Sequence, residues 1–339
     1  MYYVKNEYQG EEIYDPRLNL AIEYYLLNEK RLDEPILLFY INEPSIIIGK
    51  NQNTRAEINQ DYVRDHNIHV VRRFSGGGAV YHDLGNISFC FITDDDGNSF
   101  RNFKKFTDPV IDALHKMRVE GAELRGRNDL VIDGKKFSGN AMYSHKGRMT
   151  AHGTLMFDVD ISVTTEVLKP KKEKLTSKGV KSVRSRVTNI KPFLNDDYQN
   201  ISIHEFREIL LKFIFDVDRL DQVKEYQLTD EDWEEIFHFR DRYTGNDDWN
   251  YGKDPDYELI REGRTPAGQI EFQFNISKGK IQEISIYGDF FGLGEISDVE
   301  EALRGSDYTE EGLRETFSTL DINKYFGNIS VEDLIDLIY

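Results

Sequence analysis

Two arginines and three consecutive glycines stand between two apolar segments of this sequence, residues 68–71 and 87–92. The stretch from 72 to 86 reads Arg-Arg-Phe-Ser-Gly-Gly-Gly-Ala-Val-Tyr-His-Asp-Leu-Gly-Asn. Glycine lets a ligand approach the main chain without a Cβ in the way, and an arginine fork binds phosphate or carboxylate through two parallel hydrogen bonds. A flexible hairpin is the alternative, but the flanking charged residues favour a loop that binds an anion.

A second candidate is a lysine in a predicted β-hairpin. Asp133-Gly134 is the favoured pair for a tight type I′ turn, and apolar or basic residues flank it on both sides. Because side chains alternate along a strand, Lys136 shares a face with Ser138 if Phe137 enters the core. A bulge would break this alternation. A solvated surface lysine is the alternative role.

A third feature is a basic segment, residues 169–186, which holds eight lysines and arginines and a single acid, Glu173. The whole chain has a formal net charge of -18, so this bias is local. A solvated loop is one interpretation, and a surface that receives an acidic partner is another. The overall negative charge argues against general binding of nucleic acid.

The elements that would position these residues mix helices and strands. We expect a helix from Pro16, strands at 36–41 and 45–49, a helix at 54–67, a strand at 69–73 that leads into the glycines, a strand at 86–93 and a helix at 103–118. Farther on we expect a hairpin of strands 269–275 and 281–287, then helices at 299–303, 309–320 and 331–338. This order predicts an α+β (mixed α/β) protein.

Length and composition predict two domains. The chain has 339 residues, 39% of them hydrophobic, and a polar, turn-rich stretch at 240–251 suggests domains at residues 1–246 and 247–339. Cys90 is the one cysteine, so no intramolecular disulfide can form and we expect a cytoplasmic protein. We see neither a signal peptide nor an apolar run of the ~20 residues that span a bilayer.

Five segments, in order, resemble the motifs of the lipoate–protein ligase A family. They are 42–53 (Asn-Glu-Pro-Ser-Ile-Ile-Ile-Gly-Lys-Asn-Gln-Asn), the glycine-rich stretch 72–86, 127–130 with 136–139 (Arg-Asn-Asp-Leu and Lys-Phe-Ser-Gly), 152–155 (His-Gly-Thr-Leu), and 177–187 (Ser-Lys-Gly-Val-Lys-Ser-Val-Arg-Ser-Arg-Val). The resemblance covers roughly the first two hundred residues, and the last third resembles the small accessory domain of such ligases more weakly.

This resemblance implies a biotin/lipoate-ligase-like catalytic domain with a smaller α+β accessory domain. The implied activity is an ATP-dependent ligase that converts lipoate to lipoyl-AMP and then transfers the lipoyl group to a lysine of an acceptor. The family's key lysine precedes an apolar-Ser-Gly triplet, which selects Lys136 over Lys135 as the catalytic residue. Its ammonium is expected to lie between the lipoate carboxylate and the α-phosphate of ATP.

Further roles follow from the same resemblance, with ATP as a substrate and Mg²⁺ as a cofactor. ATP binding is implied for Arg73, Gly78, Ala79, Val80, Tyr81 and Lys136, lipoate binding for Arg73, Gly77, Lys136 and His152, closure over the adenylate for Lys178 and Gly179, and metal binding for Asp129. The implied acceptors are lipoyl domains of 2-oxoacid dehydrogenase complexes and the glycine-cleavage carrier protein. We expect neither a nucleic acid nor a membrane as a partner.

Two other functions remain as hypotheses. An octanoyl or lipoyl transferase acts without ATP through an activated cysteine, but Cys90 lies in an apolar predicted strand, where a thiol is a poor nucleophile. A non-catalytic regulator that binds lipoate would keep the pocket and lose the adenylation. The presence of Arg73, Lys136 and the basic segment together favours the enzyme.

Overall fold

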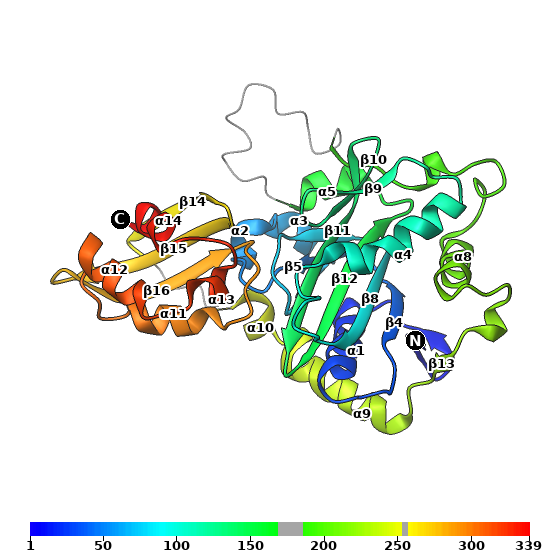
Figure 1. Ribbon diagram of the computed structural model, residues 1–339, viewed down its shortest axis with the longest axis horizontal. Coiled ribbons are helices and arrows are strands. Elements are labelled where there is room, and N and C mark those ends of the chain that lie inside the picture. Colours follow the sequence, from blue (N-terminus) through cyan, green and yellow to red (C-terminus); the bar gives the residue numbers. More distant parts are fainter. Residues whose placement is uncertain (169–185, 253–256) are drawn as a thin grey trace. The chain divides into compact units, whose positions relative to one another are not determined.

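The computed structural model describes residues 1–168, 186–252 and 257–339 (Figure 1). By their internal contacts these residues divide into two compact units. The larger unit holds Met1–Ile47, Glu57–Val71 and Val80–Asn250, and the smaller unit holds Ile48–Ala56, Arg72–Ala79 and Tyr251–Tyr339. Two short segments from the first quarter of the chain therefore belong to the smaller unit. The proposed domain division between residues 246 and 247 stays a prediction.

An eight-stranded sheet forms the centre of the larger unit. In spatial order its strands are β13 (Glu225–Tyr226), β1 (Tyr2–Lys5), β4 (Ile36–Ile41), β8 (Asn86–Asp94), β12 (Arg148–Met156), β11 (Lys135–His145), β10 (Asp129–Ile132) and β9 (Ala122–Arg125). Strand β1 is parallel to both of its neighbours, and the other pairs are antiparallel. Strand β4 is apolar and buried along its whole length, as a central strand covered on both faces must be.

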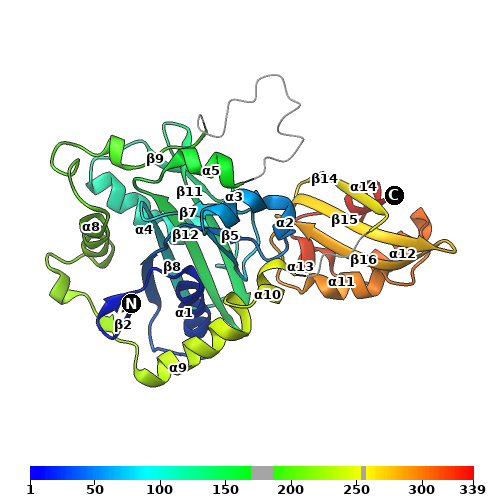
Figure 2. The same cartoon turned by 180° about the vertical axis from the view of Figure 1, so that it is seen from behind.

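Helices cover both faces of this sheet. One face packs against α1 (Pro16–Asn28) and α9 (Asp230–Phe239), which lie beside each other in Figure 2. The opposite face packs against α4 (Phe103–Lys116) and α8 (Ile203–Phe215). Helix α1 begins as predicted, because the side chain of Asp15 accepts a hydrogen bond from the Arg17 amide and Pro16 occupies the first turn.

Several short elements outside the eight-stranded sheet lie in the first half of the chain, and some of them include residues of both units. They are the hairpin strands β2 (Glu7–Tyr8) and β3 (Glu11–Glu12), the three strands β5 (Ser45–Ile48), β6 (His69–Arg72) and β7 (Val80–His82) in the order β6-β5-β7, and the helices α2 (Thr54–Glu57), α3 (Gln60–Asp65) and α5 (Ile161–Val167). The prediction of one helix over 54–67 is wrong. Ile58 is buried and pairs through its backbone with Leu168, and Asn59 caps a new helix.

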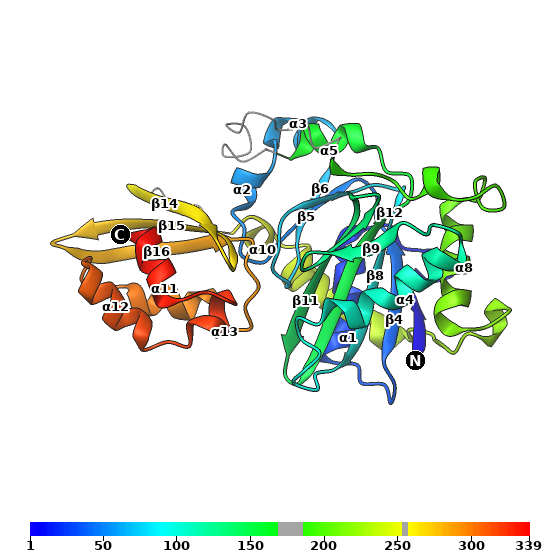
Figure 3. The ribbon, with the colours of Figure 1, turned by 45° about the horizontal axis from the view of Figure 1, so that its top comes forward.

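The smaller unit contains an antiparallel sheet with helices packed on it. Its strands are β14 (Leu259–Thr265), β15 (Gly268–Ser277) and β16 (Lys280–Gly288), and its helices are α11 (Ile296–Leu303), α12 (Glu310–Ser318), α13 (Ile322–Phe326) and α14 (Val331–Ile338), preceded in the chain by α10 (Asp247–Tyr251). Figure 3 shows α11, α12 and α13 on one side of this sheet. Ile270, Phe272 and Phe274 alternate along β15 and contribute to this core, which confirms the predicted hairpin.

Helices and strands are mixed in both units, so the expected α+β class is confirmed. Within the three described stretches of the chain, no helix has both the length and the apolar character needed to cross a membrane.

Candidate functional site

The glycine-rich loop, residues 73–79, joins β6 to β7 and is fixed from within by Arg73. Arg73 is 6% exposed. Its Nε donates to the Ser75 hydroxyl at 3.0 Å, and its Nη2 donates to the carbonyl oxygens of Gly76 and Gly78, both at 2.8 Å. A residue predicted to bind phosphate thus also holds the loop in its shape.

The glycines of this region meet different steric requirements. Gly77 has φ +95°, a backbone conformation that side chains other than glycine rarely adopt. A Cβ on Gly49 would overlap the carbonyl oxygen of Gly77, and a Cβ on Gly76 would overlap the carbonyl oxygen of Phe290, which belongs to the same unit. Gly78 is exposed and has open space where a Cβ would stand. At Gly78, therefore, a ligand has room to approach the main chain.

The neighbouring Arg72 is buried and acts on the segment that precedes α2. Its Nη1 donates to the carbonyl oxygens of Gly49, Lys50 and Gln52 at 3.0, 2.9 and 2.7 Å, and its Nη2 donates to the Thr54 hydroxyl at 2.6 Å. Burial lowers the pKa of this guanidinium to about 10, and it still carries its proton at neutral pH. The structure thus uses Arg72 to shape residues 49–54.

Strands β10 and β11 form the predicted hairpin, but its register differs from simple alternation. Asp133 and Gly134 have φ of 50° and 76°, as a type I′ turn requires. Val131 pairs with Lys136 and Leu130 pairs with Ser138, so the residue between them, Phe137, is an extra one. The expectation that Lys136 shares a face with Ser138 is therefore wrong, because a bulge interrupts the alternation. Phe137 is fully buried, as expected.

The Lys136 ammonium lies instead over Gly139, within 3.1 Å of where a Cβ on that glycine would stand. Its Nζ forms an ion pair with Asp129 Oδ1 at 2.7 Å, and the two side chains are 38% and 41% exposed. Asp129 is opposite Gly139 in the ladder, so this glycine leaves room for the pair. The structure therefore brings together two of the predicted site residues, Lys136 and Asp129.

The residues on either side of the basic segment each pair with a described residue, and on one side that residue is Lys136. The Thr188 amide donates to the Lys136 carbonyl oxygen at 2.8 Å, and Val187 pairs in parallel with Lys136. At the other end Leu168 pairs with Ile58. Residues 169–185 connect these two points, and Lys178 and Gly179 lie outside the described residues. The chain thus leaves that segment directly beside the candidate lysine.

His152 on β12 belongs to a buried polar cluster. Its Nδ1 lies 2.8 Å from Glu23 Oε2, and the Tyr40 hydroxyl donates to Glu23 Oε1 at 2.8 Å. Cys90 is opposite His152 in the ladder, and ligand atoms of Glu23, Cys90 and His152 lie within 4.8 Å of one another. Burial and the nearby Glu23 raise the pKa of the Cys90 thiol well above its ordinary value. A thiol that stays protonated is a poor nucleophile.

Sequence reasoning did not identify Glu23, which is fully buried in α1. A signal was present in the sequence, since this carboxylate interrupts an apolar run, Leu-Ala-Ile-Glu-Tyr-Tyr-Leu-Leu at 20–27. A buried carboxylate needs hydrogen-bond donors, and the sequence alone did not show that β4 and β12 would supply them.

The remaining predicted residues follow the glycines. Val80 and Tyr81 pair with Ile47 and Ile46 in the small sheet, and burial raises the pKa of the Tyr81 phenol. Just beyond them, Asp83 Oδ1 accepts the Gly85 amide at 2.8 Å and its Oδ2 accepts the Asp160 amide at 2.9 Å. Burial raises the pKa of this carboxyl. Asp83 thereby connects the end of β7 to the residues that begin α5.

Comparisons with known protein families cover most of the chain. A family model described as the lipoyl protein ligase A/B catalytic domain matches residues 15–215. A second, the bacterial lipoate protein ligase C-terminus, matches residues 254–338.

Two curated proteins are similar to the chain over nearly its whole length. Lipoate-protein ligase LplJ of Bacillus subtilis is 52% identical over 97% of this chain and 98% of its own. Lipoate–protein ligase 1 of Staphylococcus aureus is 50% identical over the same shares.

Solved structures show the same fold. LipL1 of P. falciparum in complex with lipoate superposes with a TM-score of 0.78 at 26% identity, covering 99% of this chain and 97% of its own. A lipoate-protein ligase A bound with ATP gives 0.60 at 26% identity, covering 74% and 98%. A bipartite archaeal lipoate protein ligase, from Thermoplasma acidophilum and studied with its E2 lipoyl domain, gives 0.63 at 28% identity, covering 76% and 98%.

Proposed function

We propose a function for this chain on the ground that it belongs to the lipoate–protein ligase family. It activates lipoate with ATP and then joins the lipoyl group to a lysine of an acceptor protein. Relatives at 50% and 52% identity are named lipoate–protein ligases, and similar structures were solved with lipoate and with ATP. The observation in the structure that carries the proposal is the half-exposed Lys136 ammonium, paired with Asp129 beside the attachment of the basic segment.

The first half-reaction requires two anions to meet. An oxygen of the lipoate carboxylate forms a bond to the α-phosphorus of ATP, the bond from that phosphorus to the bridging oxygen breaks, and pyrophosphate leaves. A fixed cation between the reactants offsets their repulsion and stabilises the charge that develops on the phosphoryl oxygens. Two features support this role for Lys136: its charge is partly exposed, and its partner, Asp129, is a side chain that a substrate anion can replace.

The glycine-rich loop is proposed to hold the phosphates. Amide donors from Gly78 to Tyr81 would face the nucleotide, and the open space at Gly78 supports this assignment. Arg73 would act partly through the loop, since two loop carbonyls accept its Nη2 hydrogens. The φ of +95° at Gly77 sets the turn that presents these amides.

Mg²⁺ fits the donor set around Asp129. One of its carboxylate oxygens pairs with Lys136, and the other has no hydrogen-bond or ion-pair partner among the described residues. Magnesium typically takes one or two carboxylates together with substrate phosphates, so a single exposed carboxylate suits it. Bound there, the ion would supply countercharge for the phosphates, while Lys136 is released to the reacting oxygens.

His152 is proposed to contact lipoate, with Glu23 as the residue that positions it. Because Glu23 Oε2 lies 2.8 Å from Nδ1, this contact fixes the orientation of the imidazole. The Tyr40 hydroxyl holds the second oxygen of Glu23, so the carboxylate itself is held on two sides.

In the second half-reaction the amine of an acceptor lysine attacks the carbonyl carbon of the mixed anhydride. The new C–N bond forms, the bond to the phosphate oxygen breaks, AMP leaves and the amine loses a proton. We propose lipoyl domains of 2-oxoacid dehydrogenase complexes and the glycine-cleavage carrier protein as acceptors. The archaeal relative studied with its E2 lipoyl domain supports the first of these. The buried, protonated Cys90 disfavours a cysteine-dependent transferase.

The test is the intact mass of an apo lipoyl domain after incubation with the protein, lipoate and Mg²⁺, with and without ATP. We expect a gain of one lipoyl group that requires ATP. Lys136→Ala should lower the rate by roughly 100- to 1,000-fold, the usual cost of one electrostatic donor. Lys135→Ala is the matched control, because it removes the same charge from an adjacent exposed residue. Equal rates for the two variants, or transfer without ATP from an acylated carrier, would refute the proposal.

A further inference from the structure

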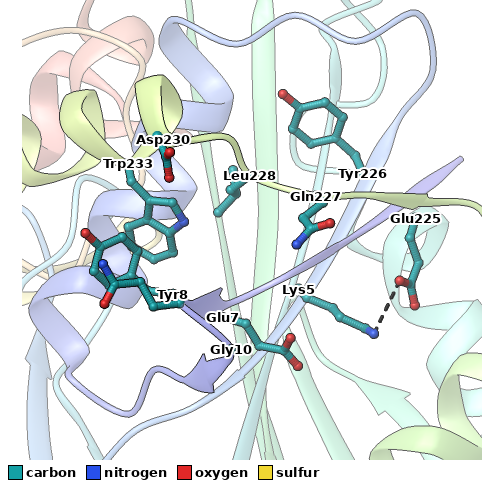
Figure 4. Close-up of a pocket in the computed structure, with 11 residues that line it drawn as sticks. Lys5, Glu7, Tyr8, Gly10, Glu225, Tyr226, Gln227, Leu228, Asp230 and Trp233 are labelled. Atoms are coloured by element: carbon teal, nitrogen blue, oxygen red, sulfur yellow. Dashed lines mark ion pairs between the residues drawn. The ribbon is translucent and has the colours of Figure 1, made fainter.

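The larger unit contains a pocket at the edge of its eight-stranded sheet (Figure 4). Its volume is about 300 Å³, near the lower end for sites that hold small molecules. Residues from the ends of β1 and β13, from the β2-β3 hairpin and from the start of α9 line it. Three strands stand between β1 and β11 in the sheet, so this pocket lies roughly 19 Å or more from Lys136 at about 4.8 Å per strand. It is therefore separate from the candidate active site.

Carboxylates dominate the charge of this pocket. Glu225 pairs with Lys5 at 3.3 Å. Glu7 and Asp230 also line the pocket, and neither side chain has an ion-pair or hydrogen-bond partner among the described residues. These two exposed carboxylates therefore border a pocket that is open to solvent. A cation that enters would be attracted by both of them.

An indole group supplies a second, independent indication of a ligand. Trp233 is 3% exposed, and its ring packs against Tyr8 with centroids 4.8 Å apart. In Figure 4 the nitrogen edge of this indole faces the interior of the pocket, toward Leu228 and Gln227. The indole N–H has no acceptor among the residues described here. The indole ring is buried while its N–H is open to the pocket, so a group that enters the pocket can accept this hydrogen bond in place of water.

The aromatic and apolar groups define the rest of the ligand. Tyr8, Trp233 and Leu228 provide surfaces on which an alkyl stem can pack, and aromatic faces also attract cations. We propose that this pocket binds an alkyl ammonium or alkyl guanidinium that carries a hydrogen-bond acceptor several bonds from the charge. Its stem lies on Tyr8 and Leu228, its cation meets Glu7 or Asp230, and its carbonyl or carboxylate oxygen accepts from Trp233.

Lysine and arginine have this chemistry, either as free amino acids or within a peptide. The two sources differ in the acceptor, which is a charged carboxylate in the free amino acid and a neutral carbonyl in the peptide. L-arginine and N-acetyl-arginine N-methylamide separate them. N-acetyl-citrulline N-methylamide is the matched control, since it has almost the same shape and no charge.

The chain has two tryptophans, so its indole N–H groups give a simple spectrum. The experiment records the ¹H-¹⁵N signals of the tryptophan-labelled full chain, with Trp249→Phe used to assign the Trp233 signal. We expect at least one arginine probe to shift that signal saturably, and the citrulline probe to leave it in place. The shift should require about tenfold more ligand when the salt is raised from 50 to 500 mM, because the attraction is electrostatic.

Variants then assign the charges. Asp230→Asn and Glu7→Gln should each weaken binding of the arginine probe about five- to tenfold. Glu231→Gln is the matched control, since Glu231 is an exposed acid of the same helix turn that does not line the pocket. The proposal is overturned if no cationic probe shifts the Trp233 signal, if citrulline shifts it equally, or if both acidic variants bind as the unchanged protein does. No lipoate or ATP is present, so the result is independent of the proposed ligase activity.

Discussion

Replacing Gly49 with alanine should disable the glycine-rich loop without unfolding the protein. An ideal Cβ on Gly49 would lie 1.9 Å from the carbonyl oxygen of Gly77 and 3.2 Å from Arg73 Nη2. Since Cβ atoms essentially never come closer than 3.0 Å to another heavy atom, the Gly77 carbonyl must move by at least about 1 Å. Gly49 itself does not have a positive φ, so the alanine backbone is not strained and the effect comes from this overlap alone.

A displacement of this size should be costly for chemistry and moderate for stability. A reacting group misplaced by about 1 Å can lose roughly 100-fold in rate, and overpacking of this kind typically costs about 1–3 kcal/mol. The assay is lipoyl-AMP formation in a single turnover, followed through pyrophosphate release, with the thermal transition recorded by circular dichroism. We expect adenylation to fall about 100-fold while the transition remains cooperative.

Gly263→Ala is the control for a loss of stability alone. A Cβ there would lie 2.8 Å from Leu337 Cδ1, the flexible end of a side chain on α14, so no backbone carbonyl has to move. If Gly49→Ala and Gly263→Ala have the same adenylation rate at equal folded fractions, the close approach of residue 49 to the loop is not what forms the phosphate site, and the reasoning fails.

Two further predictions concern buried side chains. Cys90→Ser should leave the rate of ATP-dependent lipoylation within about twofold of the unchanged protein, because the protonated thiol takes no part in the chemistry. The rate is measured by intact mass, and a loss above about tenfold in folded protein would restore the transferase hypothesis. Burial would raise the pKa of Asp232, but hydrogen bonds led by those from Tyr25 and Thr229 lower it to about 2. The stabilising effect of the Asp232 carboxylate is therefore present above its ordinary pKa of 3.8 and is lost as the pH falls toward 2. Measured by urea unfolding, Asp232→Asn should lower the free energy of unfolding by about 2 kcal/mol at pH 6 and by almost nothing near pH 2. A cost that does not change with pH would contradict this.

Elements with a strong local signal were predictable from the sequence. The Asp15-Pro16 start of α1, the Ser330 cap of α14 and the Asp133-Gly134 turn all occur where the pattern placed them. Helix α8 was missed, although it carries a complete capping box between Ser202 and Glu205. The signal was present there and was not used.

Where partners distant in the sequence decide the structure, the prediction failed. Helix propensity continues through Ile58, but pairing with Leu168, more than a hundred residues away, breaks the helix. The bulge at Phe137 has the same kind of cause, since it depends on the register against Leu130 and Val131. Neither contact leaves a trace in the local pattern of hydrophobic residues.

The arginines show why residue type alone cannot assign a role. Adjacent guanidinium groups in one loop suggested a phosphate fork, yet Arg72 uses its donors on three backbone carbonyls of the preceding segment. Arg73 donates to two carbonyls of the glycine loop itself. A buried arginine must satisfy its N–H groups, and the nearest acceptors here are main-chain atoms that no sequence pattern reveals.

The glycines also show that residue type alone does not assign a role. Their number suggested that a ligand comes close to the backbone, but at Gly49 and Gly76 it is the chain's own carbonyl groups that come close. Gly77 is required for its positive φ. Of these four glycines, only Gly78 has open space where the missing side chain would be. Substitutions at 49 and 76 therefore test how the loop is built, whereas an alanine at 78 tests what the loop binds. Whether excess ATP restores the rate of adenylation distinguishes these two effects.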